Sequence, residues 1–124
     1  MEITIGKEFK FDAAHHLPLH KGKCAHLHGH TYTMTVELKG QVDERTGMLV
    51  DFYDLNRVVS VILDEVDHKN LNDLYDQTTV EYLTHSFAGV LLKAFPKCSS
   101  VSVQLREGTG GYARASLSKE RLQS

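Results

Sequence analysis

Hydrophobic and polar residues alternate in two stretches of this chain, each about ten residues long. From Ile3 to about Ala13 the apolar side chains stand at odd positions, and from His30 to Lys39 they stand at even positions. A period of two is typical of a β-strand with one covered face, because successive side chains point to opposite sides. We therefore predict two strands in the first third of the chain.

Helical spacing of apolar residues follows in the middle of the sequence. The first helix is predicted to begin at a cap, Asp51 or Asp54, and to run to about Val66. The second is predicted to begin with a capping box, Thr78-x-x-Glu81, and to end at about Ala94, just before a proline. A turn at 43–47, a short strand at 48–50 and a polar loop at 67–73 complete this region. Two weaker strand patterns follow, at 101–105 and 112–117.

The order strand, strand, helix, helix, strand, strand predicts an α+β fold. Two amphipathic helices covering one face of a four-stranded antiparallel sheet satisfy both hydrophobic patterns. The length suits a single domain, residues 1–124, and we find no repeat or linker. A sheet this small has open edges, which favour pairing with other subunits.

Composition narrows the classes of partner. Lysine and arginine total 14 against 16 acidic residues, a net charge of −2, which argues against a protein that holds a nucleic-acid backbone. We find neither a signal peptide nor an apolar run of bilayer length. The two cysteines, Cys24 and Cys98, are far apart and form no C-x-x-C pair. We expect a cytoplasmic protein with reduced thiols and no membrane partner.

Three histidines are candidate metal ligands. His28 and His30 are two residues apart, so they share one face of a strand, and they extend the inward-facing series of the second strand. His15 extends the inward-facing series of the first strand. Three imidazoles with an open fourth position are typical of catalytic zinc, although this spacing also suits iron or nickel. The alternative is that these are ordinary polar residues at a strand entrance.

Cys24 and the pair Asp67-His68 are candidates for proton transfer. Cys24 is either a fourth metal ligand, an inert buried thiol, or a base or nucleophile whose thiolate is favoured by a metal and by Lys23. Asp67 and His68 either are polar loop residues or form a pair in which the carboxylate orients an imidazole that exchanges protons near neutral pH.

Glu107 continues an inward-facing series in the third predicted strand, and a buried carboxylate needs partners. Either it forms a salt bridge with Arg106 or Arg114, or it accepts two N–H bonds from a guanidine-like ligand edge. Glu81 is more simply a capping residue than a ligand-binding one. Lys23 is a candidate phosphate contact.

Several motifs together resemble the family of 6-pyruvoyl- and 6-carboxy-tetrahydropterin synthases over nearly the whole chain. Phe11-Asp-Ala-Ala-His15 resembles the family's F-x-A-A/S-H segment, and His28-Gly-His30 is similar to its H-G-H signature. The other matching segments are Gly22-Lys-Cys24, Gly47 to Leu55, Leu63 to Asn72, Thr79-x-Glu81 and Glu107. Thr78 stands where the family usually has proline.

The resemblance implies a role for each matching residue. It implies His15, His28 and His30 as Zn²⁺ ligands, Cys24 as the proton-abstracting thiolate, Asp67 and His68 as a second acid/base pair, and Glu107 as the pterin anchor; Thr79, Glu81 and Lys23 are further substrate-binding candidates. It also implies the tunnelling fold, in which the sheets of several subunits join into a β-barrel. The expected assembly is a homohexamer, a dimer of trimers, with active sites between subunits.

The implied substrate is 7,8-dihydroneopterin triphosphate. The short C-x-x-x-H-G-H spacing resembles the bacterial carboxy type, which releases acetaldehyde and triphosphate on the route to queuosine. One alternative is the pyruvoyl type, which keeps the side chain. Others are a related tunnelling-fold cyclohydrolase or aldolase and, from another class, a non-catalytic zinc-binding assembly module.

Overall fold

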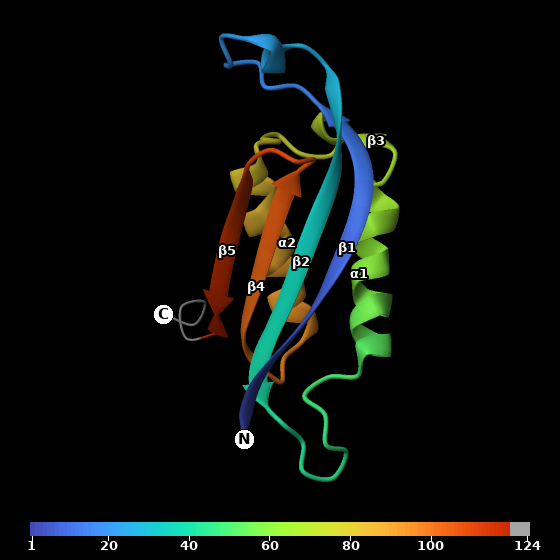
Figure 1. Cartoon of the computed structure of the whole chain (residues 1–124), viewed down its shortest axis with the longest axis vertical. Coiled ribbons are helices and arrows are strands. Elements are labelled where there is room, and N and C mark those ends of the chain that lie inside the picture. Colours follow the sequence, from blue (N-terminus) through green and yellow to red (C-terminus); the bar gives the residue numbers. More distant parts are fainter. Residues whose placement is uncertain (120–124) are drawn as a thin grey trace.

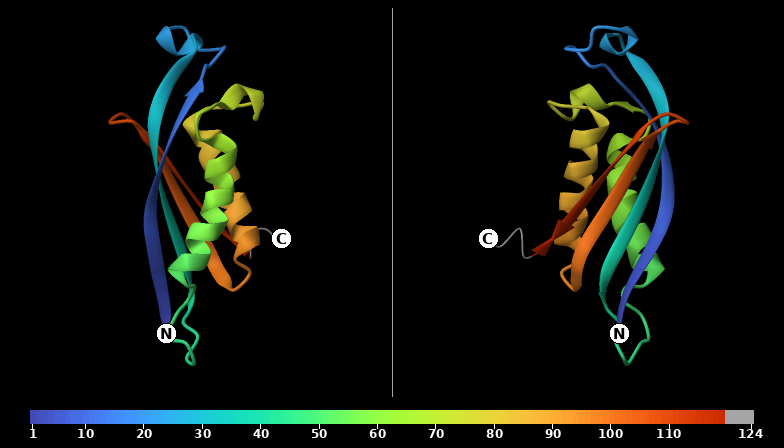
Figure 2. Two further views of the ribbon diagram at one scale, coloured as in Figure 1. Left: turned by 90° about the vertical axis from the view of Figure 1, so that its right-hand side faces the viewer. Right: turned by 60° about the vertical axis from the view of Figure 1, so that its left-hand side comes forward.

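The computed structural model describes residues 1–119 as two layers, a five-stranded sheet and a pair of helices (Figure 1). Both helices cover the same face of the sheet, as the edge-on views in Figure 2 show. The strand order is β3-β1-β2-β4-β5. The elements are β1 (Glu2–His15), β2 (His28–Gln41), α1 (Phe52–Val66), β3 (Lys69–Asn70), α2 (Val80–Ala94), β4 (Cys98–Glu107) and β5 (Tyr112–Ser118), with short 3-10 helices η1 (Lys23–Ala25) and η2 (Leu71–Asp73).

The predicted α+β fold, with two helices on one face of a mostly antiparallel sheet, is confirmed, with two corrections to the strands. The sheet has a fifth strand, β3, whose two residues pair parallel to β1 next to Ala13 and Ala14. A two-residue strand in a polar loop shows no hydrophobic period, so the sequence pattern missed it. The short strand predicted at 48–50 is wrong, because only a single bridge, between Asp43 and Met48, forms there.

The long hairpin of β1 and β2 sets the positions of the residues at its closed end. In its antiparallel register His15 lies opposite His28, and Ala13 lies opposite His30. On the other side of β2, Tyr32 lies opposite Glu107 of β4. The inward-facing residues of three strands therefore meet at one end of the sheet.

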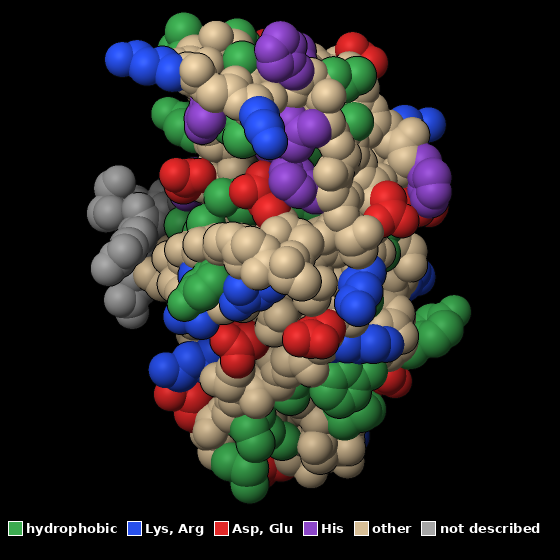
Figure 3. Space-filling model, turned by 45° about the horizontal axis from the view of Figure 1, so that its top comes forward, with side chains coloured by type: hydrophobic (Ala, Val, Ile, Leu, Met, Phe, Trp, Pro, Cys, Tyr) green, Lys and Arg blue, Asp and Glu red, His purple; other side chains and the backbone are tan. Residues whose placement is uncertain are grey.

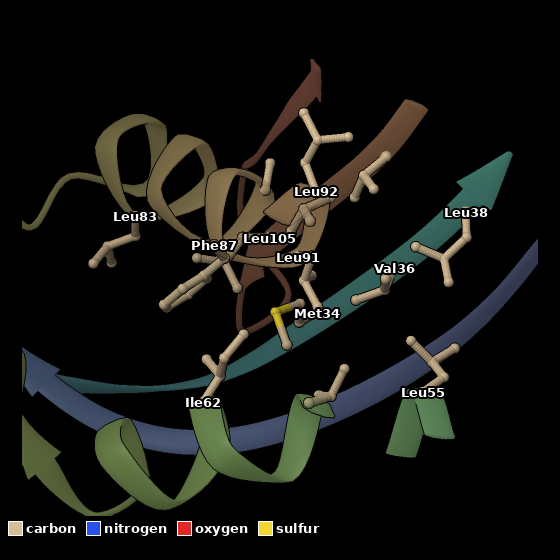
Figure 4. Close-up of a cluster of buried hydrophobic side chains, with 14 of the residues drawn as sticks. Met34, Val36, Leu38, Leu55, Ile62, Leu83, Phe87, Leu91, Leu92 and Leu105 are labelled. Carbon is tan, nitrogen blue, oxygen red and sulfur yellow. The ribbon is translucent and has the colours of Figure 1, made fainter. Parts of the chain in front are cut away.

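The core lies between the sheet and the two helices, and Figure 4 shows part of it. The even positions of β2 from Tyr32 to Leu38, among them Met34 and Val36, are fully buried, as the alternation predicted. They pack in one cluster with residues of both helices, including Leu55 and Phe87. Fully burying a side chain of this size stabilises the fold by about 1.5–3 kcal/mol, so this cluster holds the helices against the sheet.

Each helix begins at a side-chain cap, one of which differs from the prediction. Asp51 caps α1, and its carboxylate accepts the N–H of Tyr53 at 2.9 Å. The capping box predicted at Thr78 is wrong, because the N-cap of α2 is Thr79, whose hydroxyl accepts the N–H of Tyr82 at 3.3 Å. Two threonines stand side by side, and Thr78 is buried against the end of β1. Within residues 1–119 no helix is both long and apolar enough to cross a bilayer.

Candidate metal centre and active site

Three histidines meet at the closed end of the β1–β2 hairpin. His15 ends β1, His28 begins β2, and His30 follows two residues later on the same face. The ring centroids lie 4.6 Å apart for His15 and His28, 5.2 Å for His15 and His30, and 4.8 Å for His28 and His30. One nitrogen of each ring lies within 4.8 Å of the others. Figure 3 shows histidine side chains gathered at this end of the molecule.

Hydrogen bonds to backbone carbonyls orient two of these rings. Nδ1 of His15 lies 2.8 Å from the carbonyl oxygen of Thr78, and Nδ1 of His28 lies 2.8 Å from that of His26. A carbonyl only accepts, so each Nδ1 carries the proton and each Nε2 presents a lone pair. Both Nε2 atoms are shielded from solvent and have no hydrogen-bond partner within residues 1–119. This is the arrangement of metal-ligating histidines, so the residues present fit a zinc ion.

Burial favours the ligating form of His15. The side chain is 0% exposed. Loss of solvation lowers its pKa below the ordinary value of 6.5, although the Thr78 hydrogen bond and the Glu107 charge act in the opposite direction. A neutral imidazole is the form that binds a metal, so His15 is ready to bind one at neutral pH.

Glu107 points its carboxylate toward the histidines. Its Oε2 lies 3.4 Å from Nε2 of His15 and 3.6 Å from Nε2 of His30. A carboxylate and an imidazole lone pair are both acceptors, so this approach is favourable only with a proton or a cation between them. The site therefore has the charge that a divalent cation would balance.

The salt bridge considered for Glu107 with Arg106 or Arg114 is absent from the described part of the chain. Arg106 instead donates to the carbonyl of Gly110 at 2.9 Å, and its guanidinium carbon lies 4.7 Å from the centre of the Tyr112 ring. Arg114 donates to Gln104 at 2.7 Å. The hairpin between β4 and β5 thus occupies both arginines and leaves Glu107 to the histidines.

Cys24 lies in η1, in the loop that joins β1 to β2. It is a free thiol of intermediate burial, and its carbonyl accepts the N–H of Leu17 at 2.7 Å, which closes the base of the loop. Among residues 1–119 the ligand cluster contains the three histidines without Cys24. The structure therefore does not support Cys24 as a fourth metal ligand, and the three histidines leave the fourth coordination position open.

Asp67 and His68 form the predicted pair directly after α1. Nδ1 of His68 lies 3.1 Å from Oδ1 of Asp67, which also accepts the backbone N–H of Asp12 at 2.9 Å. The Asp12 hydrogen bond, followed by the interactions with His68, lowers the pKa of Asp67. His68 has a φ of 60°, a left-handed conformation that costs about 1–3 kcal/mol in a non-glycine residue and clusters at functional sites.

The pair and the histidine cluster form two separate groups of possible ligands, although His68 and His30 both line one open groove. The pair contacts Asp12, whose carboxylate accepts the hydroxyl of Thr31 at 2.5 Å. By the alternation of the strands, Asp12 and Thr31 face away from the side that carries His15 and His30. Asp12, Asp67 and His68 thus form a second group, and the sequence pattern did not single out Asp12.

Three further candidates lie outside both groups. Lys23 is exposed in η1, and Glu81 is exposed in the first turn of α2. Thr79 caps α2 through its hydroxyl. Their roles in substrate binding remain predictions. Nothing in the sequence indicated that Thr78 and His26 are partners of the histidines, since a backbone carbonyl leaves no signal in residue types.

The family described as 6-pyruvoyl tetrahydropterin synthase matches residues 4–117. The 6-carboxy-5,6,7,8-tetrahydropterin synthase of Haemophilus influenzae is 49% identical over 80 residues, which span 61% of this chain and 55% of that protein. The dihydroneopterin monophosphate aldolase of Pyrococcus furiosus is 38% identical over 81 residues, or 65% of this chain and 68% of that protein. The structure of Caenorhabditis elegans 6-pyruvoyl tetrahydropterin synthase is similar with a TM-score of 0.80 at 28% identity, covering 95% of this chain and 97% of that one.

Proposed function

This chain belongs to the 6-pyruvoyl tetrahydropterin synthase family, and on that premise we propose that it is a zinc-dependent 6-carboxy-5,6,7,8-tetrahydropterin synthase, a lyase. Its substrate is 7,8-dihydroneopterin triphosphate, and its products are 6-carboxytetrahydropterin, acetaldehyde and triphosphate. One observation carries the proposal: the imidazoles of His15, His28 and His30 converge beside a carboxylate, and two of their Nε2 atoms have no hydrogen-bond partner within residues 1–119. We place the protein in the cytoplasm, where its free thiols stay reduced.

The three histidines would hold the zinc ion, which would supply Lewis acidity toward the hydroxyl groups of the substrate side chain. Cys24, in the loop that joins the two histidine-bearing strands, removes a proton from the carbon next to the ring. His68, held by Asp67, exchanges a second proton. Glu107 accepts N–H groups of the pterin edge, because a carboxylate matches two parallel donors.

The open edges of the sheet support an assembly in which the site lies between subunits. The outer edge of β1 pairs with β3 at residues 13–14 and binds the backbone of His68 at Asp12. Over the rest of its length no strand within residues 1–119 pairs with this edge, and β5 forms the opposite edge of the sheet. The strand pairings make β1 and β5 antiparallel to each other. Edge β5 of one copy can thus pair with β1 of the next and close a barrel. We propose a trimeric ring and, by the family resemblance, a homohexamer.

Two observations bear on the branch of the family. The spacing Cys24-x-x-x-His28 and the 49% identity to the Haemophilus influenzae carboxy-type enzyme favour the carboxy product on the route to queuosine. The similarity to an archaeal aldolase favours, as second candidate, simple cleavage of the same side chain. The pyruvoyl-type elimination uses the same donor set and retains all three side-chain carbons.

A single product assay separates these reactions. Zinc-loaded protein is incubated with 7,8-dihydroneopterin triphosphate, and the products are identified by mass spectrometry. We expect 6-carboxytetrahydropterin and acetaldehyde. An intact three-carbon side chain indicates the pyruvoyl reaction, and side-chain cleavage without triphosphate release indicates an aldolase. No product from zinc-loaded protein would favour the non-catalytic assembly module.

Variants of the two cysteines test the proposed base. Cys24→Ala should retain zinc and lose turnover by about 10²-fold or more, the range of a missing general base. Cys98→Ala is the matched control, because Cys98 is buried in the core at the start of β4. Parent-like turnover by Cys24→Ala would refute the role of the thiol.

A further inference from the structure

The segment between β3 and α2 clamps the end of β1 through Asn72. Oδ1 of Asn72 accepts the backbone N–H of His16 at 2.9 Å, and Nδ2 donates to the carbonyl of the same residue at 3.1 Å. Asn72 is itself held by Asn70, whose side chain accepts its backbone N–H at 3.1 Å. The side-chain amide of Asn72 thus binds both the N–H and the carbonyl of His16. This fixes the backbone where β1 ends.

Thr78 connects this clamp to the imidazole of His15. Its side chain is buried, and its hydroxyl oxygen lies 3.3 Å from both the His16 carbonyl and Oδ1 of Asn72. Its own carbonyl accepts Nδ1–H of His15 at 2.8 Å. Its backbone N–H donates to Gln77 at 3.1 Å. A proline here would keep the carbonyl but would lack both the hydroxyl and the N–H.

The position of that carbonyl decides which nitrogen of His15 can bind a metal. A neutral imidazole carries its proton on either nitrogen and can rotate about the Cβ–Cγ bond. An acceptor held beside Nδ1 selects the form in which Nε2 presents its lone pair toward His28 and His30. If the carbonyl of Thr78 moves, the ring of His15 is held less firmly and the form protonated at Nδ1 is favoured less.

We propose that Thr78 is a positioning residue for the metal centre, with Asn72 as its anchor. The hydroxyl of Thr78 locks the peptide whose carbonyl orients His15. This role rests on the zinc centre of the proposed function, and it concerns binding of the ion rather than turnover. It also gives a function to the residue by which this chain departs from the proline of the family motif.

The test measures zinc affinity in the full-length protein and in three variants. Thr78→Val removes the hydroxyl with little change in shape, and Thr78→Ser retains it. Thr84→Val is the matched control, because Thr84 is equally buried in α2 but donates its hydroxyl to Val80 in its own helix. The dissociation constant is obtained by competition with a chromophoric chelator. The absorption bands of the Co²⁺-substituted proteins report the geometry of the site.

Loss of an outer-shell partner of a metal ligand typically weakens affinity by about 10–100-fold. The hydroxyl of Thr78 acts through a carbonyl, so we expect the lower end, about tenfold for Thr78→Val, with altered Co²⁺ bands. Thr78→Ser and Thr84→Val should stay close to the parent. If Thr78→Val does not fold, Thr78→Ala takes its place, since it also removes the hydroxyl and keeps the carbonyl.

Each unfavourable outcome has its own meaning. Parent-like zinc affinity and Co²⁺ bands in folded Thr78→Val would overturn the positioning role alone. Equal weakening by Thr84→Val would also overturn it, because the effect would then reflect general loss of stability. A parent protein that binds no zinc would refute the metal centre itself.

Discussion

Within residues 1–119 the buried hydroxyl of Tyr32 has no hydrogen-bond partner, and its removal should stabilise the metal-free protein. The Tyr32 ring stacks on Phe11, with centroids 4.8 Å apart and planes inclined by 12°. The side chain is fully buried, and its oxygen has no partner within the described residues. Burial, with a smaller effect of the Glu107 charge, raises the pKa of Tyr32 far above its ordinary value, so the group stays a neutral phenol.

The expected magnitude follows from the cost of that missing hydrogen bond. A buried polar group without a partner costs about 1–3 kcal/mol. Tyr32→Phe removes the hydroxyl and keeps the stacked ring, so the packing against Phe11 is retained. We expect the free energy of unfolding to rise by about 1 kcal/mol, the lower end, because small shifts around the hydroxyl already recover part of the cost. For a chain of this length that corresponds to a Tm higher by about 3–5 °C.

Urea denaturation of the metal-free protein measures this change. The midpoint should rise at an unchanged m-value, and the protomer concentration must be held constant because association contributes to stability. Tyr82→Phe is the control, since Tyr82 is exposed and its variant should stay within about 0.5 kcal/mol of the parent. A loss of more than about 0.5 kcal/mol in Tyr32→Phe would refute the reasoning, because it would mean that the hydroxyl has a partner in the folded protein.

Three further predictions concern the metal, pH and a helix cap. His28→Ala should lower zinc affinity by more than the 10–100-fold of an outer-shell change, while the exposed His85→Ala should not, as measured by chelator competition. Burial lowers the pKa of His15 in the folded protein, so below about pH 6.5 the unfolded chain binds more protons than the folded one. The free energy of unfolding of the metal-free protein should therefore fall as the pH drops through that value. A free energy of unfolding that is constant from about pH 7.5 to about 5.5 would contradict this. Asp51→Ala removes the cap of α1 and should cost about 1 kcal/mol in urea denaturation, whereas an unchanged midpoint would show that this cap contributes nothing.

Much of the fold could be predicted because the hydrophobic periodicity of each segment indicates its secondary structure. The alternation along β1 and β2 predicted which faces of the strands are covered, and it placed the three candidate ligand histidines on the face that the helices cover. Helical spacing predicted both helices to within a few residues. The prediction failed where a choice depended on distant contacts. Burial of Thr78 against the end of β1 moved the cap of α2 to Thr79, and pairing with β1 made a strand of Lys69–Asn70.

The sequence by itself determined the chemistry available at this end of the molecule: three imidazoles, a thiol, a carboxylate and an acid–imidazole pair, with the histidines on one face of their strands. Residue types and their period carry that information, since both are properties of the chain alone. Only the tertiary structure decided which nitrogen of His15 and of His28 presents its lone pair, because the deciding partners are carbonyls of Thr78 and His26. It also decided that Asp67 and His68 join Asp12 in a second group of possible ligands, distinct from the three histidines. Such choices depend on how strands and loops meet in space, and no local pattern records them.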